Sequence, residues 1–123
     1  MNDKKTVLVV DDSRVSRMMA RQFILSARPQ WLVEDAATGE EALEKVKTVQ
    51  PVLILVDVNM PGIGGMAAAE QLRSICPGTH ISLVTANVQN ATRNRANELG
   101  IGFMEKPITE GRIHALIAAL STD

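Results

Sequence analysis

The sequence predicts an α/β fold, a single doubly wound (βα)5 domain whose five-stranded parallel sheet is covered by helices on both faces. Two observations lead to this prediction. Five short apolar runs alternate along the chain with longer stretches at helical spacing, and this alternation is typical of βαβ units with right-handed crossovers. The chain has 123 residues, 46% of them hydrophobic, so we expect one domain over residues 1–123 with a full apolar core.

The strands are predicted from the short apolar runs. These runs cover residues 7–10, 31–33, 52–56, 81–84 and 101–104. The first, third and fourth are nearly continuous and rich in β-branched residues, which is typical of strands buried on both faces. We therefore expect helices to cover the sheet on both sides.

The first helix is predicted directly after the first strand. Val15, Met18 and Met19 begin an apolar stripe at helical spacing, and Phe23 and Ile24 continue it less regularly. Methionine often fills irregular gaps in protein interiors. We therefore interpret Met18 and Met19 as core residues.

The later helices are marked by signals at their ends. Thr38 and Glu41 form a capping box, in which the Thr38 hydroxyl accepts from the Glu41 amide and the Glu41 carboxylate reaches back to Thr38. Gly100 is placed to end the fourth helix. Three prolines separate helical stretches from the strands that follow: Pro29, Pro51 and Pro77. One side of the last helix is formed by Ile113, Leu116, Ile117 and Leu120.

Polar side chains follow four of the predicted strands. They are Asp11 and Asp12 after the first, Asp57 after the third, Thr85 after the fourth, and Glu105 and Lys106 after the fifth. The second strand ends in Ala36 and Ala37. Ligands of open parallel sheets gather at the carboxyl ends of the strands. The sequence therefore predicts a site in which carboxylates, a hydroxyl group and an ammonium group share one edge of the sheet.

Carboxylates held close together repel one another, so either one takes up a proton or a cation lies among them. Oxygen ligands without neighbouring His or Cys suit Mg²⁺, which takes one or two carboxylates together with phosphate oxygens. We therefore expect Mg²⁺ as the cofactor. The alternative is that Asp11 and Asp12 only cap the first helix, but capping does not account for Asp57, Thr85 and Lys106 at the ends of other strands.

Asp57 differs from the other carboxylates in its context. It follows the most apolar strand and precedes the turn signal Asn59-Met60-Pro61-Gly62. A carboxylate beside a metal ion and a lysine can act as a nucleophile toward phosphorus and form an acyl phosphate. Lys106 would then hold a transferring oxygen. The alternative, that Lys106 only pairs structurally with Asp57, is compatible with this role.

Four segments of the chain carry a family resemblance. They read Val9-Val10-Asp11-Asp12-Ser13, Val56-Asp57-Val58-Asn59-Met60-Pro61-Gly62, Val84-Thr85-Ala86-Asn87 and Phe103-Met104-Glu105-Lys106-Pro107. In this order and spacing they resemble the CheY-like receiver domain of bacterial two-component response regulators, over nearly the whole chain. The resemblance implies the strand order 2-1-3-4-5.

The resemblance also implies roles for the acidic residues. Asp57 would be the phosphoacceptor, taking a phosphoryl group from a phosphohistidine of a sensor kinase or phosphotransfer protein. Asp12, Asp57 and the main-chain carbonyl of Asn59 would bind Mg²⁺ directly, and Asp11 would bind it through water. Asn59 and Asn87 occupy the positions that tune the lifetime of the phosphoryl group.

The remaining roles implied by the resemblance concern the switch. Lys106 would bind a phosphoryl oxygen and would precede Pro107 through a cis peptide bond. Thr85 would hydrogen-bond the phosphoryl group, and Phe103 would turn inward with it. The output would be binding of a protein target, or self-association, through the fourth helix, fifth strand and fifth helix. Such a domain is no enzyme beyond its own aspartyl phosphorylation and dephosphorylation.

One residue departs from the pattern of this family. Gly64 stands where an Asp usually caps the third helix. Glycine is only a few tenths of a kcal/mol poorer as a cap. We therefore expect the exchange to leave the chemistry unchanged.

Composition excludes several other classes of function. Thirteen Lys and Arg against fourteen Asp and Glu leave no basic excess, and three aromatic residues are too few for base stacking, so we expect no direct nucleic-acid binding. No apolar run approaches the length of a membrane span. The lone Cys76 fits a reducing compartment. We therefore expect a cytoplasmic protein that binds no membrane.

Two alternatives from other functional classes stay open. The first is a receiver-like interaction module that is not phosphorylated, against which the residues Asp12, Asp57, Thr85 and Lys106 argue. The second is a phosphatase of the haloacid dehalogenase type, but the segment after the third strand lacks that class's second carboxylate, since Asn59 stands at its place. The chain is either a separate receiver or part of a larger regulator.

Overall fold

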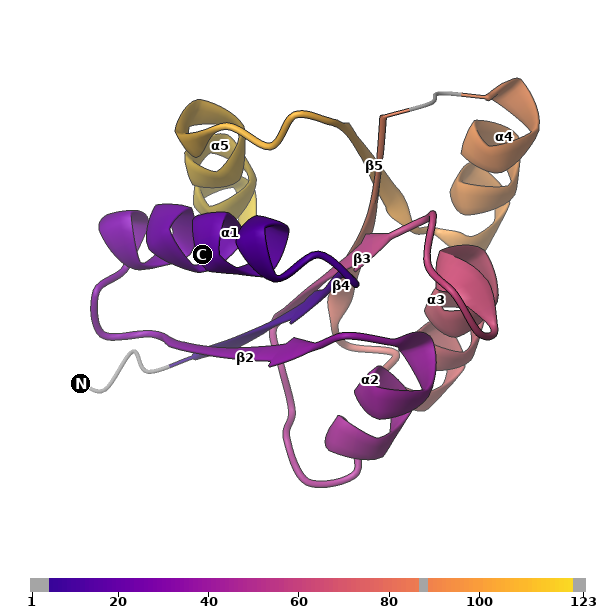
Figure 1. The fold of residues 1–123 in the computed structure, drawn as a ribbon, viewed down its shortest axis with the longest axis horizontal. Helices are drawn as coiled ribbons and strands as arrows, with labels where there is room; N and C mark the ends of the chain where they lie inside the picture. Colours follow the sequence, from indigo (N-terminus) through magenta and orange to yellow (C-terminus); the bar gives the residue numbers. More distant parts are fainter. Residues whose placement is uncertain (1–4, 87–88, 121–123) are drawn as a thin grey trace.

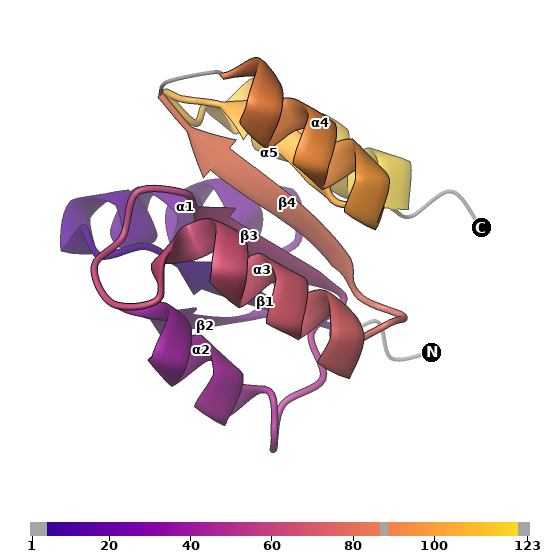
Figure 2. The same ribbon diagram turned by 90° about the vertical axis from the view of Figure 1, so that its right-hand side faces the viewer.

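Five parallel strands form the sheet, in the order β2-β1-β3-β4-β5. The computed structural model describes residues 5–86 and 89–120. The strands are β1 (Thr6–Val10), β2 (Leu32–Ala36), β3 (Leu53–Asp57), β4 (His80–Thr85) and β5 (Gly102–Glu105); β1 is labelled in Figure 2 and the others in Figure 1. Every neighbouring pair is parallel. The predicted sheet and its strand order are confirmed.

In the described residues, five helices cover the two faces of the sheet. They are α1 (Arg14–Ala27), α2 (Gly39–Lys45), α3 (Gly64–Ile75), α4 (Asn90–Leu99) and α5 (Glu110–Leu120). α1 and α5 lie on one face, while α2, α3 and α4 lie on the other (Figures 1 and 2). None of these helices is long and apolar enough to span a membrane. The predicted α/β class is confirmed.

Each face of the sheet has its own apolar core, because neighbouring residues of a strand point to opposite faces. The core under helices α2, α3 and α4 is called the α2–α4 core. It consists of Leu8, Val10, Ala36, Ala42, Val46, Ile54, Val56, Ala69, Leu72, Ile81, Leu83, Ala96 and Ile101. The core under the two helices α1 and α5 is called the α1–α5 core, and it consists of Val7, Val9, Ala20, Ile24, Trp31, Leu53, Leu55, Val84, Ile113 and Ile117. The central strands thus contribute to both layers at once.

The strands differ in how closely they match their predictions. The central strands β1, β3 and β4 are buried almost throughout, as their nearly continuous apolar runs predict. β2 covers Leu32–Ala36 rather than residues 31–33. It is an edge strand, so Glu34 and Asp35 can continue it while their side chains reach solvent. Trp31 precedes β2 and is buried in the α1–α5 core.

The orientation of α1 corrects the prediction for its methionines. Val15, Met18 and Met19 are 65%, 56% and 44% exposed, so the two methionines are not core residues. The residues of α1 that are fully buried are Ala20 and Ile24. The prediction was wrong because alanine adds little to an apolar pattern, and the side of the helix that faces the sheet runs through Ala20.

The ends of α2 and α4 follow local signals. The Thr38 hydroxyl accepts from the Glu41 amide at 3.0 Å, as predicted. The Glu41 carboxylate accepts from the amide of Ala37 at 2.8 Å, one residue before the predicted partner Thr38. Gly100 follows α4 with a φ of 70°, a left-handed conformation that glycine adopts without strain.

Candidate functional site

Four of the predicted site residues lie at the carboxyl edge of the sheet. Asp57 ends β3 and Thr85 ends β4. Asp11 follows β1 directly, and Lys106 follows β5. Because all five strands are parallel, these ends face the same way, so the chain brings together groups that are far apart in sequence.

Three carboxylates form a cluster at this edge. Asp11, Asp12 and Asp57 each offer one oxygen atom, and these atoms all lie within 4.8 Å of one another. Asp11 and Asp57 are buried, whereas Asp12 is exposed. Oxygen ligands of this kind are what Mg²⁺ prefers in proteins. The donor set therefore fits a hard divalent cation, with the Asp12 side open to solvent.

The alternative that Asp11 and Asp12 only cap α1 is excluded. The N-cap of α1 is Ser13, whose hydroxyl accepts from the Ser16 amide at 3.2 Å. Asp11 Oδ1 instead accepts from the Ser13 amide at 2.8 Å. This hydrogen bond helps to hold the Asp11 carboxylate in place within the cluster.

Lys106 brings positive charge to the buried carboxylates. Its Nζ lies 3.4 Å from Asp57 Oδ1 and 3.5 Å from Asp11 Oδ2. The two ion pairs place one ammonium group between both acids, so the structural pairing that the sequence suggested is present. The peptide bond between Lys106 and Pro107 is cis, as the resemblance implies.

The electrostatics of the cluster centre on Asp57. Burial raises the pKa of the Asp57 carboxyl, and the nearby charge of Asp11 raises this pKa further. Lys106 and the Asn59 amide, which donates to Asp57 Oδ1 at 3.3 Å, oppose the shift without cancelling it. The carboxylate of Asp57 is thus short of compensating positive charge, which a bound cation would supply.

Thr85 and Phe103 lie on neighbouring strands. Thr85 is buried, and its main-chain carbonyl accepts from the Lys106 amide at 2.8 Å. Phe103 lies in β5 and is partly buried against the α2–α4 core. The guanidinium carbon of Arg93, on α4, lies 5.4 Å from the centre of the Phe103 ring, within the range of a cation–π contact.

The structure describes one of the two asparagines of the predicted site. Asn59 is exposed in the loop between β3 and α3, and its amide contacts Asp57. Asn87 lies outside the described residues.

Two glycines shape the loop after Asp57. A Cβ atom on Gly65 would lie 2.0 Å from the main-chain oxygen of Asp57, so only glycine fits there. Gly64 has a φ of 83°, in the left-handed region that favours glycine. α3 begins at Gly64, after Ile63, without a side-chain cap. Glycine at position 64, where the family usually has Asp, therefore allows a left-handed main-chain conformation there. From the sequence, we predict only a weaker cap for the third helix.

Sequence reasoning missed two arginines that support the site. Arg17 of α1 donates to the main-chain carbonyl of Asp11 at 2.7 Å and pairs with Asp35 at 3.0 Å. Arg112 of α5 contacts the main chain on both sides of Lys106. Both side chains reach the site loops from helices, and no motif in the sequence signals such contacts.

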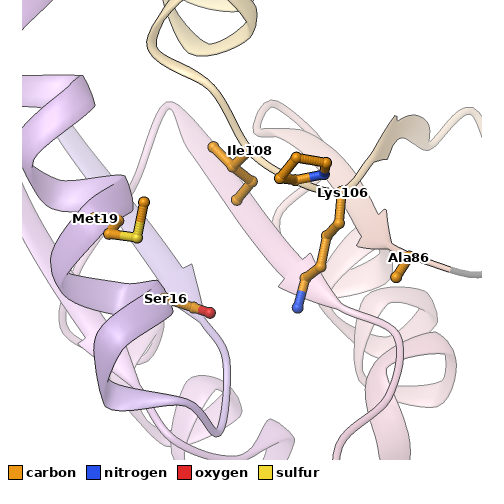
Figure 3. A pocket seen from close by; sticks show the side chains of 6 residues that line it. Ser16, Met19, Ala86, Lys106 and Ile108 are labelled. Carbon is orange, nitrogen blue, oxygen red and sulfur yellow. The ribbon is translucent and has the colours of Figure 1, made fainter.

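A pocket of about 380 Å³ opens beside Lys106, between α1 and the loop that follows β5 (Figure 3). It is lined by Ser16, Met19, Ala86, Lys106, Pro107 and Ile108. Figure 3 shows Met19 and Ile108 on opposite sides of the pocket, with the side chain of Lys106 bordering it. The basic group of the site is therefore reachable from the surface.

Comparisons with known proteins agree with this geometry. The chemotaxis protein CheY of Thermotoga maritima is 33% identical to this chain over 110 residues, which cover 89% of this chain and 91% of that protein. A protein-glutamate methylesterase/protein-glutamine glutaminase of Methanosarcina acetivorans is 34% identical over 68% of this chain, but this match spans only 24% of its own length.

A solved structure of a response regulator from Burkholderia pseudomallei is similar in fold. It has a TM-score of 0.83 and 25% identity, and the match covers 97% of this chain and 68% of that one. That protein carries a phosphorylated aspartic acid, a calcium ion and citrate.

The family model of the response regulator receiver domain matches residues 7–118. This range includes most or all of each strand and helix of the described structure. Receiver domains are signalling modules. With its parallel sheet, its acidic cluster and this match over most of its length, the chain belongs to the response regulator receiver domain family.

Proposed function

We propose that residues 1–123 form one receiver domain that takes a phosphoryl group onto Asp57, from a phosphohistidine of a histidine kinase or phosphotransfer protein. The observation that carries the proposal is the convergence of three carboxylates and one ammonium group at the ends of β1, β3 and β5. The related structure from Burkholderia pseudomallei contains a phosphorylated aspartic acid and a calcium ion, which supports the same chemistry here.

In the transfer, a carboxylate oxygen of Asp57 attacks phosphorus. The oxygen–phosphorus bond forms while the nitrogen–phosphorus bond of the donor breaks, and the imidazole nitrogen leaves with the electron pair and takes up a proton. Lys106 stands beside the attacking carboxylate and would hold a phosphoryl oxygen. The raised pKa of Asp57 means that its anionic, nucleophilic form needs neighbouring positive charge.

Asp12, Asp57 and the carbonyl of Asn59 would hold Mg²⁺ directly, and Asp11 would hold it through water. The ion would offset the negative charge of the carboxylates and of the incoming phosphoryl group. The exposure of Asp12 leaves one side of the cluster open to that group.

Thr85 and Phe103 would form the switch that follows phosphorylation. The Thr85 carbonyl accepts from the Lys106 amide, and the Phe103 ring of β5 contacts Arg93 of α4. A movement of both would alter the face made by α4, β5 and α5, which would bind a protein target or a second copy of the chain. Asn59 and Asn87 would tune the lifetime of the phosphoryl group.

A protein donor suits the surroundings of the site better than a small phosphate ester. Val15, Met18 and Met19 expose an apolar surface on α1, and Met19 also lines the pocket beside Lys106. Exposed apolar patches next to a site are typical of protein interfaces. We propose that the phosphohistidine protein covers this surface while its imidazole reaches Asp57.

The test is incorporation of a phosphoryl group, followed by the mass of the intact protein. With acetyl phosphate and Mg²⁺, the unaltered protein should gain one phosphoryl group, Asp57→Asn should gain none, and the control Glu44→Gln, an exposed carboxylate on α2, should match the unaltered protein. Absence of labelling in the unaltered protein would favour an interaction module that is not phosphorylated. Sustained turnover of small phosphate esters would favour the phosphatase.

A further inference from the structure

Arg112 makes two contacts that flank Lys106 along the chain. Its Nη1 donates to the carbonyl oxygen of Glu105 at 2.6 Å and to that of Pro107 at 3.1 Å. These are the residues directly before and after Lys106. One guanidinium group therefore binds the main chain on both sides of the lysine that faces the acidic cluster.

The position of β5 explains why this contact matters. β5 is an edge strand, with β4 on one side only. The Lys106 amide donates to the Thr85 carbonyl on the β4 side, and successive strand residues direct their main-chain groups to opposite edges. The Glu105 carbonyl therefore faces the open edge of the sheet, where Arg112 supplies the donor that a further strand would provide.

Arg112 lies in the first turn of α5, which hydrogen bonding and packing hold in place. Its amide donates to the Thr109 hydroxyl at 3.1 Å, in the first turn of α5. The next residue, Ile113, is fully buried in the α1–α5 core, as is Ile117 one turn later. The start of α5 is therefore packed firmly against the sheet. Through its hydrogen bonds to the main chain, Arg112 holds the loop that carries Lys106 at a fixed position relative to α5.

The side chain of Lys106 depends on this main-chain position. Its long, flexible stem places Nζ 3.4 Å from Asp57 and 3.5 Å from Asp11, and both carboxylates are buried. A shift of about 1 Å in a group at a reacting centre can lower a rate by about a hundredfold. Loosening of the loop would thus spread the ammonium group over positions that no longer face Asp57.

We infer that Arg112 is a positioning residue, which acts through the main chain of residues 105–107 to hold Lys106 against Asp57. The inference rests on the proposed function, since it requires Lys106 to assist phosphoryl transfer. No direct contact of Arg112 with the phosphoryl group is involved.

The experiment measures the rate of Asp57 phosphorylation by acetyl phosphate with Mg²⁺, over a range of donor concentrations. Arg112→Ala should lower the maximal rate by about tenfold or more, with little change in the donor concentration that gives half of that rate. Arg112→Lys should recover part of the loss, because an ammonium group can still donate to a carbonyl. The matched control is Arg21→Ala, which removes a 3.0 Å contact from α1 to the Val33 carbonyl on the other edge strand, and its rate should equal that of the unaltered protein.

The decisive step is a double-mutant comparison. In a Lys106→Ala background, Arg112→Ala should cause no further loss of rate, because its effect passes through Lys106. A full rate for Arg112→Ala, or an equal loss in both backgrounds, would overturn the inference. Thermal unfolding of each variant shows whether the fold is retained, and the Arg112→Lys protein supplies the test if Arg112→Ala is unfolded. If the unaltered protein itself takes no phosphoryl group, the proposed function fails, which is a different outcome.

Discussion

The ionised side chain of Asp57 lowers the stability of the folded protein, although the site requires it. Its carboxyl is buried beside the charge of Asp11, and the loss of hydration is only partly offset by Lys106 at 3.4 Å. The folded protein therefore binds a proton at Asp57 more readily than the unfolded chain does. A functional requirement for a nucleophile near a cation accounts for a residue that stability alone would not favour.

The raised pKa of Asp57 gives a pH-dependent prediction for the metal-free protein. A folded-state pKa above the ordinary value of 3.8 means that stability is lost as the pH rises through the folded-state pKa. Asp57→Asn should therefore raise the free energy of unfolding at pH 7, and this advantage should shrink as the pH falls toward 3.8. Urea unfolding at several pH values, with a metal chelator present, measures the difference.

Glu44→Gln serves as the control for that comparison, because Glu44 is an exposed carboxylate. It should show no comparable pH-dependent gain. Added Mg²⁺ should stabilise the unaltered protein and not Asp57→Asn, since a ligand that binds only the folded state stabilises it. An asparagine variant that is less stable than the unaltered protein at pH 7 would contradict the argument.

At the scale of elements, the sequence predicts most where the signal is local. The apolar runs of β1, β3 and β4 are nearly continuous because both faces are covered. Thr38 marks a helix start through its side-chain hydroxyl, and Gly100 marks a helix end through its left-handed main chain. The aspartates of the site could also be predicted, because strand ends of a parallel sheet share one edge.

The rest depends on tertiary packing. β2 extends through Glu34 and Asp35 only because it is an edge strand. The buried side of α1 runs through Ala20 and not through the methionines, since the sheet selects which side is covered. Arg17 has no motif, and its contact with Asp11 depends on where α1 lies over the sheet. Such contacts depend on how the helices pack against the sheet, and no apolar periodicity or motif in the sequence predicts them.

The loop between β3 and α3 gives a prediction at the same scale. Gly65→Ala would place a Cβ atom 2.0 Å from the Asp57 oxygen and 2.6 Å from Val58 Cα, so the main chain beside Asp57 must shift. We expect a loss of about 3 kcal/mol in the free energy of unfolding, together with slower phosphorylation of Asp57. Gly111→Ala, where no atom lies within 4 Å, should instead stabilise α5 by up to about 1 kcal/mol.

Both Gly65→Ala and Gly111→Ala are measured by urea unfolding and by acetyl phosphate labelling. Equal stability of the two alanine variants would show that the close approach at Gly65 relaxes without cost.

At the scale of the whole molecule, one sheet separates two apolar cores that share its strands. Ile54 in β3 belongs to the α2–α4 core and Ile117 in α5 to the α1–α5 core, and both are fully buried. Because the central strands contribute to both layers, we expect the two cores to unfold together. The site lies at the end of these shared strands, so its geometry depends on both layers together.

A matched pair of substitutions tests this cooperativity. Ile54→Val and Ile117→Val should each lower the free energy of unfolding by about 1 kcal/mol. Trp31 lies in the α1–α5 core, so its fluorescence reports on that side, while circular dichroism reports on all helices. Ile54→Val should shift both signals equally, as expected for two-state unfolding. A shift in circular dichroism without one in Trp31 fluorescence would show that the two layers unfold separately.

The two edge strands share a further feature. The Leu32 amide and the Ala36 carbonyl are bonded toward β1, so the carbonyls of Val33 and Asp35 point away from the sheet, where Arg21 and Lys45 bind them. Exposed strand edges are templates on which other chains can add, and basic side chains block them. With basic side chains on both borders, the two edge strands offer fewer free carbonyls to which a strand of another chain could bond.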